Sequence, residues 1–262
     1  MNERNGYRLG LVSVSFRAHS PEEILRATRA AGLSCIEWGS DVHAPYTDAE
    51  RLRGLAALQR EYGIECSSYG TYFRLGETPI SELPLYISAA KILGTDILRL
   101  WCGTGSGADY GDAERETLFS ECRRAAELAR EMGVTLCMEC HRRTFTERKE
   151  DVVELMEAVG SPHFRMYWQP FQWLSAAESL AVARTVAPYA EHLHVFNWRG
   201  AEKLPLCDAV EEWRAYLSVL PPMRTLLLEF MPDGRLETLP REAEALRAIA
   251  SGSRTLEGGE IR

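Results

Sequence analysis

The sequence predicts an α/β protein that folds as a single-domain (β/α)₈ TIM barrel, and two observations carry this prediction. Apolar, β-branched stretches typical of strands recur eight times, about every 30 residues, which is the length of a strand, a loop, a helix and a return turn. Helical patterns fill the gaps between these stretches. Eight such units in succession predict a parallel sheet that closes on itself. We assign residues 1–250 to the barrel and expect residues 251–262 to form a flexible C-terminal tail.

The expected strands are short apolar runs bounded by turn residues. They are Leu9–Phe16, Cys35–Gly39, Ile64–Tyr69, Ile97–Cys102, Val134–Cys140, Arg165–Gln169, His192–Asn197 and Thr225–Phe230.

The first expected helix begins at a capping box, because Ser20 precedes Glu23 by three residues and Pro21 stands at the first helical position. The helices are expected at Ile24–Ala31, Asp48–Tyr62, Glu82–Leu93, Ala113–Met132, Glu150–Val159, Ala176–Val186, Cys207–Leu220 and Pro240–Ala250. Five of them end on a glycine, a residue that tolerates the left-handed conformation that stops a helix. These glycines are Gly32, Gly63, Gly94, Gly133 and Gly160.

An open, doubly wound sheet is the alternative fold. Such a sheet usually has a glycine-rich phosphate loop after its first strand. Here that position reads Ser13-Val14-Ser15-Phe16-Arg17, without a G-x-G-x-x-G pattern. The closed barrel is therefore preferred.

Composition limits the classes of partner. The chain has 262 residues and a formal net charge of −8, which argues against nucleic acid as the main partner but leaves a small anionic substrate open. Its seven cysteines show no disulfide-like spacing and favour a reducing compartment. No apolar run approaches the roughly 20 residues of a membrane span. We therefore expect a cytoplasmic protein without a membrane partner.

Polar side chains stand where the expected strands end, and in a barrel such positions line the active-site mouth. They are Glu37, Glu139, His141, Gln169, Gln172, His194 and Glu229. Four of them come from four successive strands at equivalent depths, namely Glu139, Gln169, His194 and Glu229. Two carboxylates, an imidazole and an amide oxygen are a plausible donor set for one divalent cation, such as Mn²⁺, Mg²⁺, Co²⁺ or Zn²⁺.

Each of these residues also has an ordinary structural interpretation. A single carboxylate such as Glu37 is often solvated or paired with an arginine, and a single histidine in a strand is often only a hydrogen-bonded structural group. Four tryptophans at or just past strand ends suit either rim packing or stacking on a sugar ring. They are Trp38, Trp101, Trp168 and Trp198.

At these positions the chain resembles the sugar phosphate isomerase/epimerase superfamily, the xylose isomerase-like barrels. Glu139-Cys140-His141 stands where the family has E-N-H, and His194-Val195-Phe196-Asn197-Trp198 stands where it has H-V-K-D-W. A glutamate on the eighth strand, here Glu229, completes the match. The resemblance implies that Glu139, His194 and Glu229 are metal ligands and that the two glutamates exchange the substrate proton.

The sixth strand departs from the family pattern. Gln169-Pro170-Phe171-Gln172 replaces the usual D-P-G-H, so that an aspartate ligand and a substrate-binding histidine have both become amides. A neutral amide oxygen still coordinates a hard cation, but affinity generally falls with ligand charge.

The resemblance implies a metal-dependent isomerase or epimerase that acts on a small sugar, sugar phosphate or keto-acid. Proton abstraction next to a carbonyl would lead to an enediolate, with Glu139 and Glu229 as the acid/base pair. The candidate substrate-binding residues are His141, Gln172, Arg199, Trp101, Trp198 and Glu37. Barrels of this family often pair, so a homodimer is also open.

Three other functions compete with this one. A dehydratase, similar to inosose dehydratase, would use the same site and also abstract a proton next to a carbonyl. A sugar-binding barrel without catalysis would result if the metal had been lost together with the acidic ligand. An endonuclease acting on damaged DNA would need a histidine-rich zinc cluster and a basic groove, whereas this chain has six histidines and a charge of −8.

Overall fold

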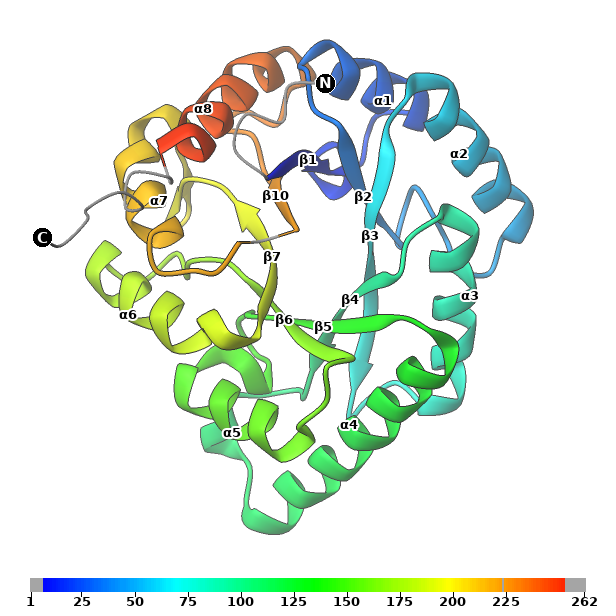
Figure 1. Ribbon diagram of the computed structural model, residues 1–262, viewed down its shortest axis with the longest axis vertical. Helices are drawn as coiled ribbons and strands as arrows, with labels where there is room; N and C mark the ends of the chain where they lie inside the picture. Colours follow the sequence, from blue (N-terminus) through cyan, green and yellow to red (C-terminus); the bar gives the residue numbers. More distant parts are fainter. Residues whose placement is uncertain (1–6, 223, 253–262) are drawn as a thin grey trace, which may run out of the picture.

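Eight parallel strands form a closed barrel surrounded by helices in the computed structural model, which describes residues 7–222 and 224–252 (Figure 1). The strands pair around the barrel in the order β1-β10-β7-β6-β5-β4-β3-β2. The predicted fold class, a single-domain TIM barrel, is therefore confirmed. Of the predicted tail, Ser251 and Gly252 continue the last helix, whereas residues 253–262 lie outside the described residues.

Helices alternate with the barrel strands along the chain. The barrel strands are β1 (Arg8–Val12), β2 (Cys35–Gly39), β3 (Glu65–Leu75), β4 (Ile97–Cys102), β5 (Thr135–Glu139), β6 (Phe164–Trp168), β7 (Ala190–Val195) and β10 (Thr225–Leu228). The α-helices are α1 (Pro21–Ala30), α2 (Ala49–Tyr62), α3 (Leu83–Leu93), α4 (Asp112–Met132), α5 (Lys149–Val159), α6 (Ala176–Val186), α7 (Val210–Leu217) and α8 (Leu239–Gly252).

Helix ends follow the expected sequence signals. The capping box at the start of α1 is present, with the backbone N–H of Glu23 donating to Ser20 Oγ and that of Ser20 donating to the Glu23 carboxylate. Four of the five predicted glycines cap their helices with a left-handed backbone, at the ends of α2, α3, α4 and α5. At the fifth position the cap of α1 is Ala31, and Gly32 follows it with a φ of 71°.

Strands β2 and β4 have the predicted bounds, whereas the other six differ from the prediction at one or both ends, and three of these differences stand out. The first strand ends at Val12 and gives way to a 3₁₀ turn over Ser13–Phe16, because the chain bends where Ser13 Oγ accepts a hydrogen bond from the Gly39 backbone N–H. Strand β3 continues to Leu75, since the alternate residues Thr71, Phe73 and Leu75 stay buried beyond Tyr69. The last strand ends before Glu229.

Alternate residues of the strands point to opposite sides of the sheet. The inward-facing apolar residues form a separate small cluster inside the barrel, made of Val12, Val14, Cys35, Ile97, Cys137, Tyr167 and Leu227. The outward-facing residues pack under the helices. The polar residues that continue the inward series toward the strand ends therefore converge at one end of the barrel.

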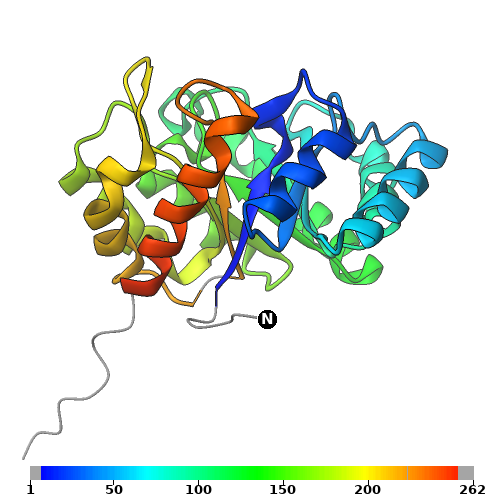
Figure 2. The ribbon, with the colours of Figure 1, turned by 90° about the horizontal axis from the view of Figure 1, so that it is seen from above.

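A two-stranded antiparallel hairpin, β8 (Trp198–Arg199) with β9 (Glu202–Lys203), follows β7 and was not predicted. Figure 2 shows this hairpin in yellow at the top of the view. The blue strand β1 runs toward the same side.

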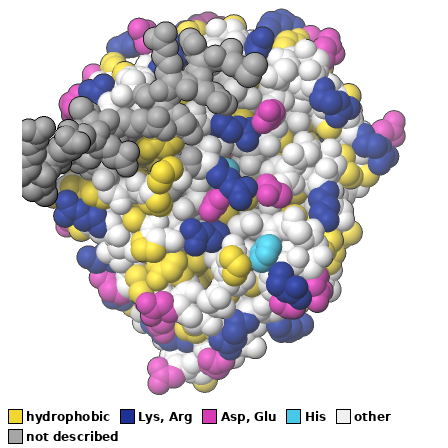
Figure 3. All heavy atoms as spheres, in the orientation of Figure 1, with side chains coloured by type: hydrophobic (Ala, Val, Ile, Leu, Met, Phe, Trp, Pro, Cys, Tyr) yellow, Lys and Arg dark blue, Asp and Glu magenta, His cyan; other side chains and the backbone are white. Residues whose placement is uncertain are grey.

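At the amino ends of the strands, ion pairs join residues in or next to different strands. Glu191 of β7 receives both Arg165 and Arg224, and Arg8 pairs with Glu65. Figure 3 shows acidic and basic side chains next to one another across the face seen in Figure 1. Among the described residues, no helix is long and apolar enough to cross a membrane.

Candidate active site

A cavity of about 570 Å³ opens at the carboxyl ends of the strands. Residues from several strand ends and loops line it, among them Arg99, Trp101, Glu139, His141, Gln169, Gln172, Trp198 and Glu229. A somewhat larger cavity of about 690 Å³ lies against α4 and is lined by Thr104, Asp109 and Glu121, among others. The smaller cavity is the candidate active site, because it lies at the carboxyl ends of the strands and its lining residues Glu139 and Glu229 form a cluster with the buried His194.

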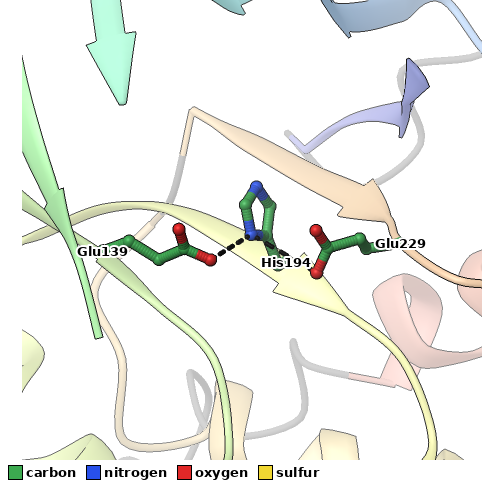
Figure 4. A group of neighbouring side chains, drawn as sticks. All are labelled: Glu139, His194 and Glu229. Atoms are coloured by element: carbon green, nitrogen blue, oxygen red, sulfur yellow. Dashed lines mark ion pairs between the residues drawn. The ribbon is translucent and has the colours of Figure 1, made fainter. Parts of the chain in front are cut away.

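Glu139, His194 and Glu229 form the centre of this site (Figure 4). Glu139 is the last residue of β5, His194 lies in β7, and Glu229 directly follows β10. The Nδ1 atom of His194 lies 3.5 Å from Glu139 Oε1 and 3.6 Å from Glu229 Oε2. All three side chains are buried.

Gln169 joins the cluster from the residue after β6. Its Oε1 atom lies 3.1 Å from His194 Nδ1, and its Nε2 donates to the carbonyl oxygen of Cys140 at 3.2 Å. Because the Nε2 atom is bonded to a backbone carbonyl, the amide oxygen is the atom presented to the cluster. The structure thus brings together the four residues predicted as metal ligands.

Glu37 lies beneath this cluster, on β2. Its Oε1 atom lies 3.4 Å from His194 Nε2, so the two nitrogens of the imidazole face carboxylates on opposite sides. Its Oε2 accepts a hydrogen bond from Ser68 Oγ at 2.9 Å, and Tyr167 in turn donates to Ser68 Oγ at 2.7 Å. Glu37 is fully buried and does not line the cavity, so it contacts the site only through residues such as His194 and Arg99.

Arg99 is a site residue that the sequence analysis missed. It lies on β4, is 3% exposed, and donates from Nη1 to Glu139 Oε2 at 2.9 Å. Its Nε lies 3.6 Å from Glu37 Oε1. The signal was an arginine inside the apolar strand Ile97–Cys102, on the same face as Trp101. This pattern could have marked Arg99 as unusual, but it could not have predicted that Arg99 contacts Glu139 and Glu37.

Trp101 contacts the same carboxylate. Its Nε1 donates to Glu139 Oε2 at 2.6 Å, so this oxygen accepts from both Arg99 and Trp101. The other oxygen, Oε1, faces His194. Glu139 is therefore held in one orientation with one oxygen directed toward the centre of the site.

The environments of the two central glutamates move their pKa values in opposite directions. Burial raises the pKa of Glu229 to about 7; the neighbouring charge of His194 opposes this, and that of Glu139 adds to it. Burial also acts to raise the pKa of Glu139, but the charge of Arg99 and the hydrogen bond with His194 outweigh it and hold the pKa below its usual range.

The buried cations have the complementary shifts. Burial lowers the pKa of His194, but the carboxylates of Glu229 and Glu37 outweigh this effect and raise it to about 10. Burial likewise acts to raise the pKa of Glu37, yet His194 and Arg99 lower it to about 2. Three carboxylates are thus balanced in part by two cations beneath the cavity.

The donor atoms fit a divalent cation. Ligands held at about 2.0–2.2 Å from a metal ion lie roughly 3.0–3.5 Å from their neighbours in the coordination shell. An incoming ion would displace the proton from His194 Nδ1. This nitrogen has three oxygens at 3.1, 3.5 and 3.6 Å, from Gln169, Glu139 and Glu229. The far nitrogen of His194 faces Glu37, and a carboxylate in that position commonly orients a ligating histidine. The amide of Gln169 and the nearby charge of Arg99 both reduce the negative charge available to the ion.

Some of the predicted substrate-binding residues line the cavity and others do not. His141, Gln172, Trp101 and Trp198 line the cavity, and the ring of His141 lies against Trp101 with centroids 4.9 Å apart. Arg199 does not line it and instead pairs with Glu212 of α7.

Two of the four tryptophans noted at strand ends face away from the site. Trp38 and Trp168 point outward, where Trp38 donates to Gln59 of α2 and Trp168 packs against Trp213 of α7. Of these four tryptophans, Trp101 and Trp198 line the cavity.

Comparisons with known proteins agree with this architecture. A family model described as xylose isomerase-like TIM barrel matches residues 25–249. No curated protein sequence matches the chain significantly.

Solved structures of similar fold come from several bacteria. The probable 3-DHS dehydratase AsbF of Bacillus anthracis has a TM-score of 0.70 and 18% identity, over 92% of this chain and 98% of that chain. A D-psicose 3-epimerase of Clostridium cellulolyticum, solved with D-tagatose, has a TM-score of 0.67 and 14% identity, over 94% and 99%. A xylose isomerase-like TIM barrel protein of Mycobacterium smegmatis, solved with magnesium, has a TM-score of 0.67 and 15% identity, over 94% and 98%. At these identities the likeness concerns the fold.

Proposed function

Because this chain belongs to the xylose isomerase-like TIM barrel family, we propose that it is a sugar isomerase or epimerase that moves a proton next to a carbonyl group. One observation supports this most. Glu139 and Glu229 face the same imidazole at the cavity floor, with pKa values shifted in opposite directions. Two carboxylates whose environments separate their pKa values are typical of an acid/base pair.

The two glutamates then have distinct tasks. Glu139 is ionised, and its Oε1 is the oxygen directed to the centre of the site beside His194, because Arg99 and Trp101 occupy Oε2. Glu229, with a pKa of about 7, both holds and releases a proton near neutral pH. In Figure 4 the two carboxylates approach His194 from opposite sides. One carboxylate removes the proton from the substrate carbon and the other returns it to the planar enediolate.

A divalent cation at this site would be held by Glu139, Gln169, His194 and Glu229, and when bound it would supply Lewis acidity to the substrate carbonyl. Glu37 orients His194 for this task, because it faces the far ring nitrogen. Trp101 and Trp198 provide apolar walls for the carbon skeleton of a small sugar-like substrate.

A dehydratase is the second candidate. The structurally similar AsbF protein is described as a probable 3-DHS dehydratase. Such a reaction begins with the same proton abstraction but then expels a hydroxyl group, so the same glutamates would serve it. A barrel that only binds sugars is the third candidate, and it would take up no divalent cation.

Proton exchange with solvent tests the proposal directly. The protein, supplied with Mn²⁺ or Mg²⁺, is incubated in D₂O with a panel of ketoses, ketose phosphates and sugar acids, and NMR follows the signal of the proton next to the carbonyl. We expect exchange with at least one substrate, and a decrease of about 10²–10⁴-fold in Glu229→Gln. A new alkene signal would identify a dehydratase instead. Absence of exchange across the panel would contradict both catalytic functions.

A further inference from the structure

Most cations that line the cavity are already paired with carboxylates. Arg99 contacts Glu139 and Glu37, and Arg17 donates to Asp41 at 2.5 Å. Their charges are therefore largely neutralised within the protein.

Arg142 differs from both. It stands three residues after Glu139, lines the cavity and is exposed. Within residues 7–222 and 224–252, no carboxylate pairs with its guanidinium group and no acceptor receives a hydrogen bond from it. Its guanidinium carbon instead lies 5.4 Å from the ring centroid of Trp173. Trp173 also lines the cavity and is 46% exposed, which is unusual for so large an apolar side chain.

The position of the Arg142–Trp173 pair is set by neighbouring contacts. Phe171 stacks on Trp173 with ring centroids 4.9 Å apart, and Phe171 is itself buried. The carbonyl oxygen of Arg142 lies 2.8 Å from His141 Nδ1, and His141 lies against Trp101. Phe171 thus supports Trp173, and the guanidinium group of Arg142 lies near the Trp173 ring with its hydrogen-bond donors open to a ligand.

A second unpaired cation, Lys203, lies against aromatic residues that line this cavity. Lys203 of the β8–β9 hairpin lies 5.1 Å from the ring centroid of Trp198 and 4.8 Å from that of Phe230. Both aromatic residues line the cavity. Among the described residues, Lys203 has no acidic partner. Although the chain has a net charge of −8, two unpaired cations, Arg142 and Lys203, thus lie on aromatic residues of this cavity.

We propose that the substrate is an anion, a small hydroxylated molecule with a carboxylate or phosphate group that Arg142 receives at the mouth of the cavity. The inference rests on the proposed function, because it names the substrate class of that same site. An arginine fork matches the oxygens of either group, and Lys203 adds attraction without a fixed direction. The reacting carbon then lies deeper, toward Glu139 and Glu229.

Binding of three related probes tests this inference without requiring turnover. D-Fructose is neutral, D-fructose 6-phosphate carries a phosphate, and D-gluconate carries a carboxylate. Isothermal titration calorimetry compares the wild-type protein with Arg142→Gln and Arg143→Gln. The second variant is a matched control, because Arg143 is an exposed neighbour that loses the same charge and does not line the cavity.

We expect at least one anion to bind roughly 10–100-fold more tightly than D-fructose, the range that a charged hydrogen bond provides. Arg142→Gln should lose this preference, Arg143→Gln should keep it, and added salt should weaken it. The better anion identifies the group as phosphate or carboxylate.

Equal binding of all three probes, no binding of either anion, or equal losses in the two variants would overturn the inference. A different result would show that the proposed function is wrong. In that case the difference in binding between the probes would remain, and only the proton exchange in D₂O would be absent.

Discussion

Arg99 donates a hydrogen bond to Glu139 Oε2 over 2.9 Å, and both side chains are about 95% or more buried. A charged pair at this depth is costly to bury, and it is far more costly to leave half of it unpaired. The relationship links stability to chemistry, because the oxygen of Glu139 that Arg99 occupies is not available to a substrate or an ion.

Removal of the buried cation should destabilise the fold. In Arg99→Met, both Glu139 and Glu37 lose a positive partner, and we expect the free energy of unfolding to fall by about 3–5 kcal/mol. Urea denaturation in the presence of a chelator measures it. Arg53→Met serves as the control, because Arg53 is exposed on α2 and should change stability by no more than about 0.5 kcal/mol. Similar losses in both variants would show that the buried pair has no special role.

The backbone beneath the pair needs a residue without a side chain. A Cβ atom at Gly70 of β3 would lie 2.5 Å from Glu37 Oε1 and 3.0 Å from an Arg99 nitrogen. We expect Gly70→Ala to cost about 1–3 kcal/mol of stability, the usual range for overpacking. Gly54 lies inside α2 with open space around it, so Gly54→Ala should instead stabilise by about 0.5–1 kcal/mol. Thermal unfolding of the two variants, which add the same methyl group, would show shifts of opposite sign.

His192 should make stability depend on pH. Burial lowers its pKa to about 3, whereas the unfolded chain titrates near pH 6.5. Below pH 6.5 the unfolded state therefore binds a proton that the folded state excludes, and stability falls as the pH decreases from about 6.5 to 3. The slope from this one group reaches about 1.4 kcal/mol per pH unit. Denaturant unfolding at several pH values should give a shallower dependence in His192→Gln. Parallel curves would disprove the assignment.

Restoring an acidic ligand should strengthen binding of a divalent cation. The amide oxygen of Gln169 lies 3.1 Å from His194 Nδ1, so Gln169→Asp adds a negative charge beside the donor set. We expect the affinity for Mn²⁺, measured by calorimetry on metal-free protein, to rise about ten-fold. Gln172→Asp is the control, since Gln172 lines the same cavity outside the donor cluster. An equal increase in the control would indicate general electrostatic attraction rather than coordination.

Much of the architecture could be predicted from local patterns. Each strand, helix and glycine stop depends only on neighbouring residues in the chain, so it could be predicted locally. The number of repeats, eight, then predicted a closed barrel. Strand alternation also predicted which side chains share a face, and the structure places Glu139, His194 and Glu229 within one cluster. A side chain on a strand points either into or out of the barrel, so the alternation of residues predicts which side chains meet inside it.

Other features depend on contacts between distant segments. Arg199 follows β7 at the expected place, but α7 presents Glu212 to it and turns it away from the cavity. Phe230 has a φ of 56°, and its backbone N–H donates to Ser15 Oγ, 215 residues earlier in the chain. Neither could be inferred from residues nearby in the sequence.

By itself, the sequence determined the barrel, its helix ends and the inward direction of the polar residues, since these follow from periodicity and backbone conformation. Only the tertiary structure decided how their charges combine. Arg99 reaches Glu139 across 40 positions of the chain, and His194 stands between Glu37 and Glu139, which are contributed by different strands. The strength of a buried charge depends on the distance and direction of its partner. Those quantities exist only when the strands are side by side, so the electrostatics of the site belong to the fold.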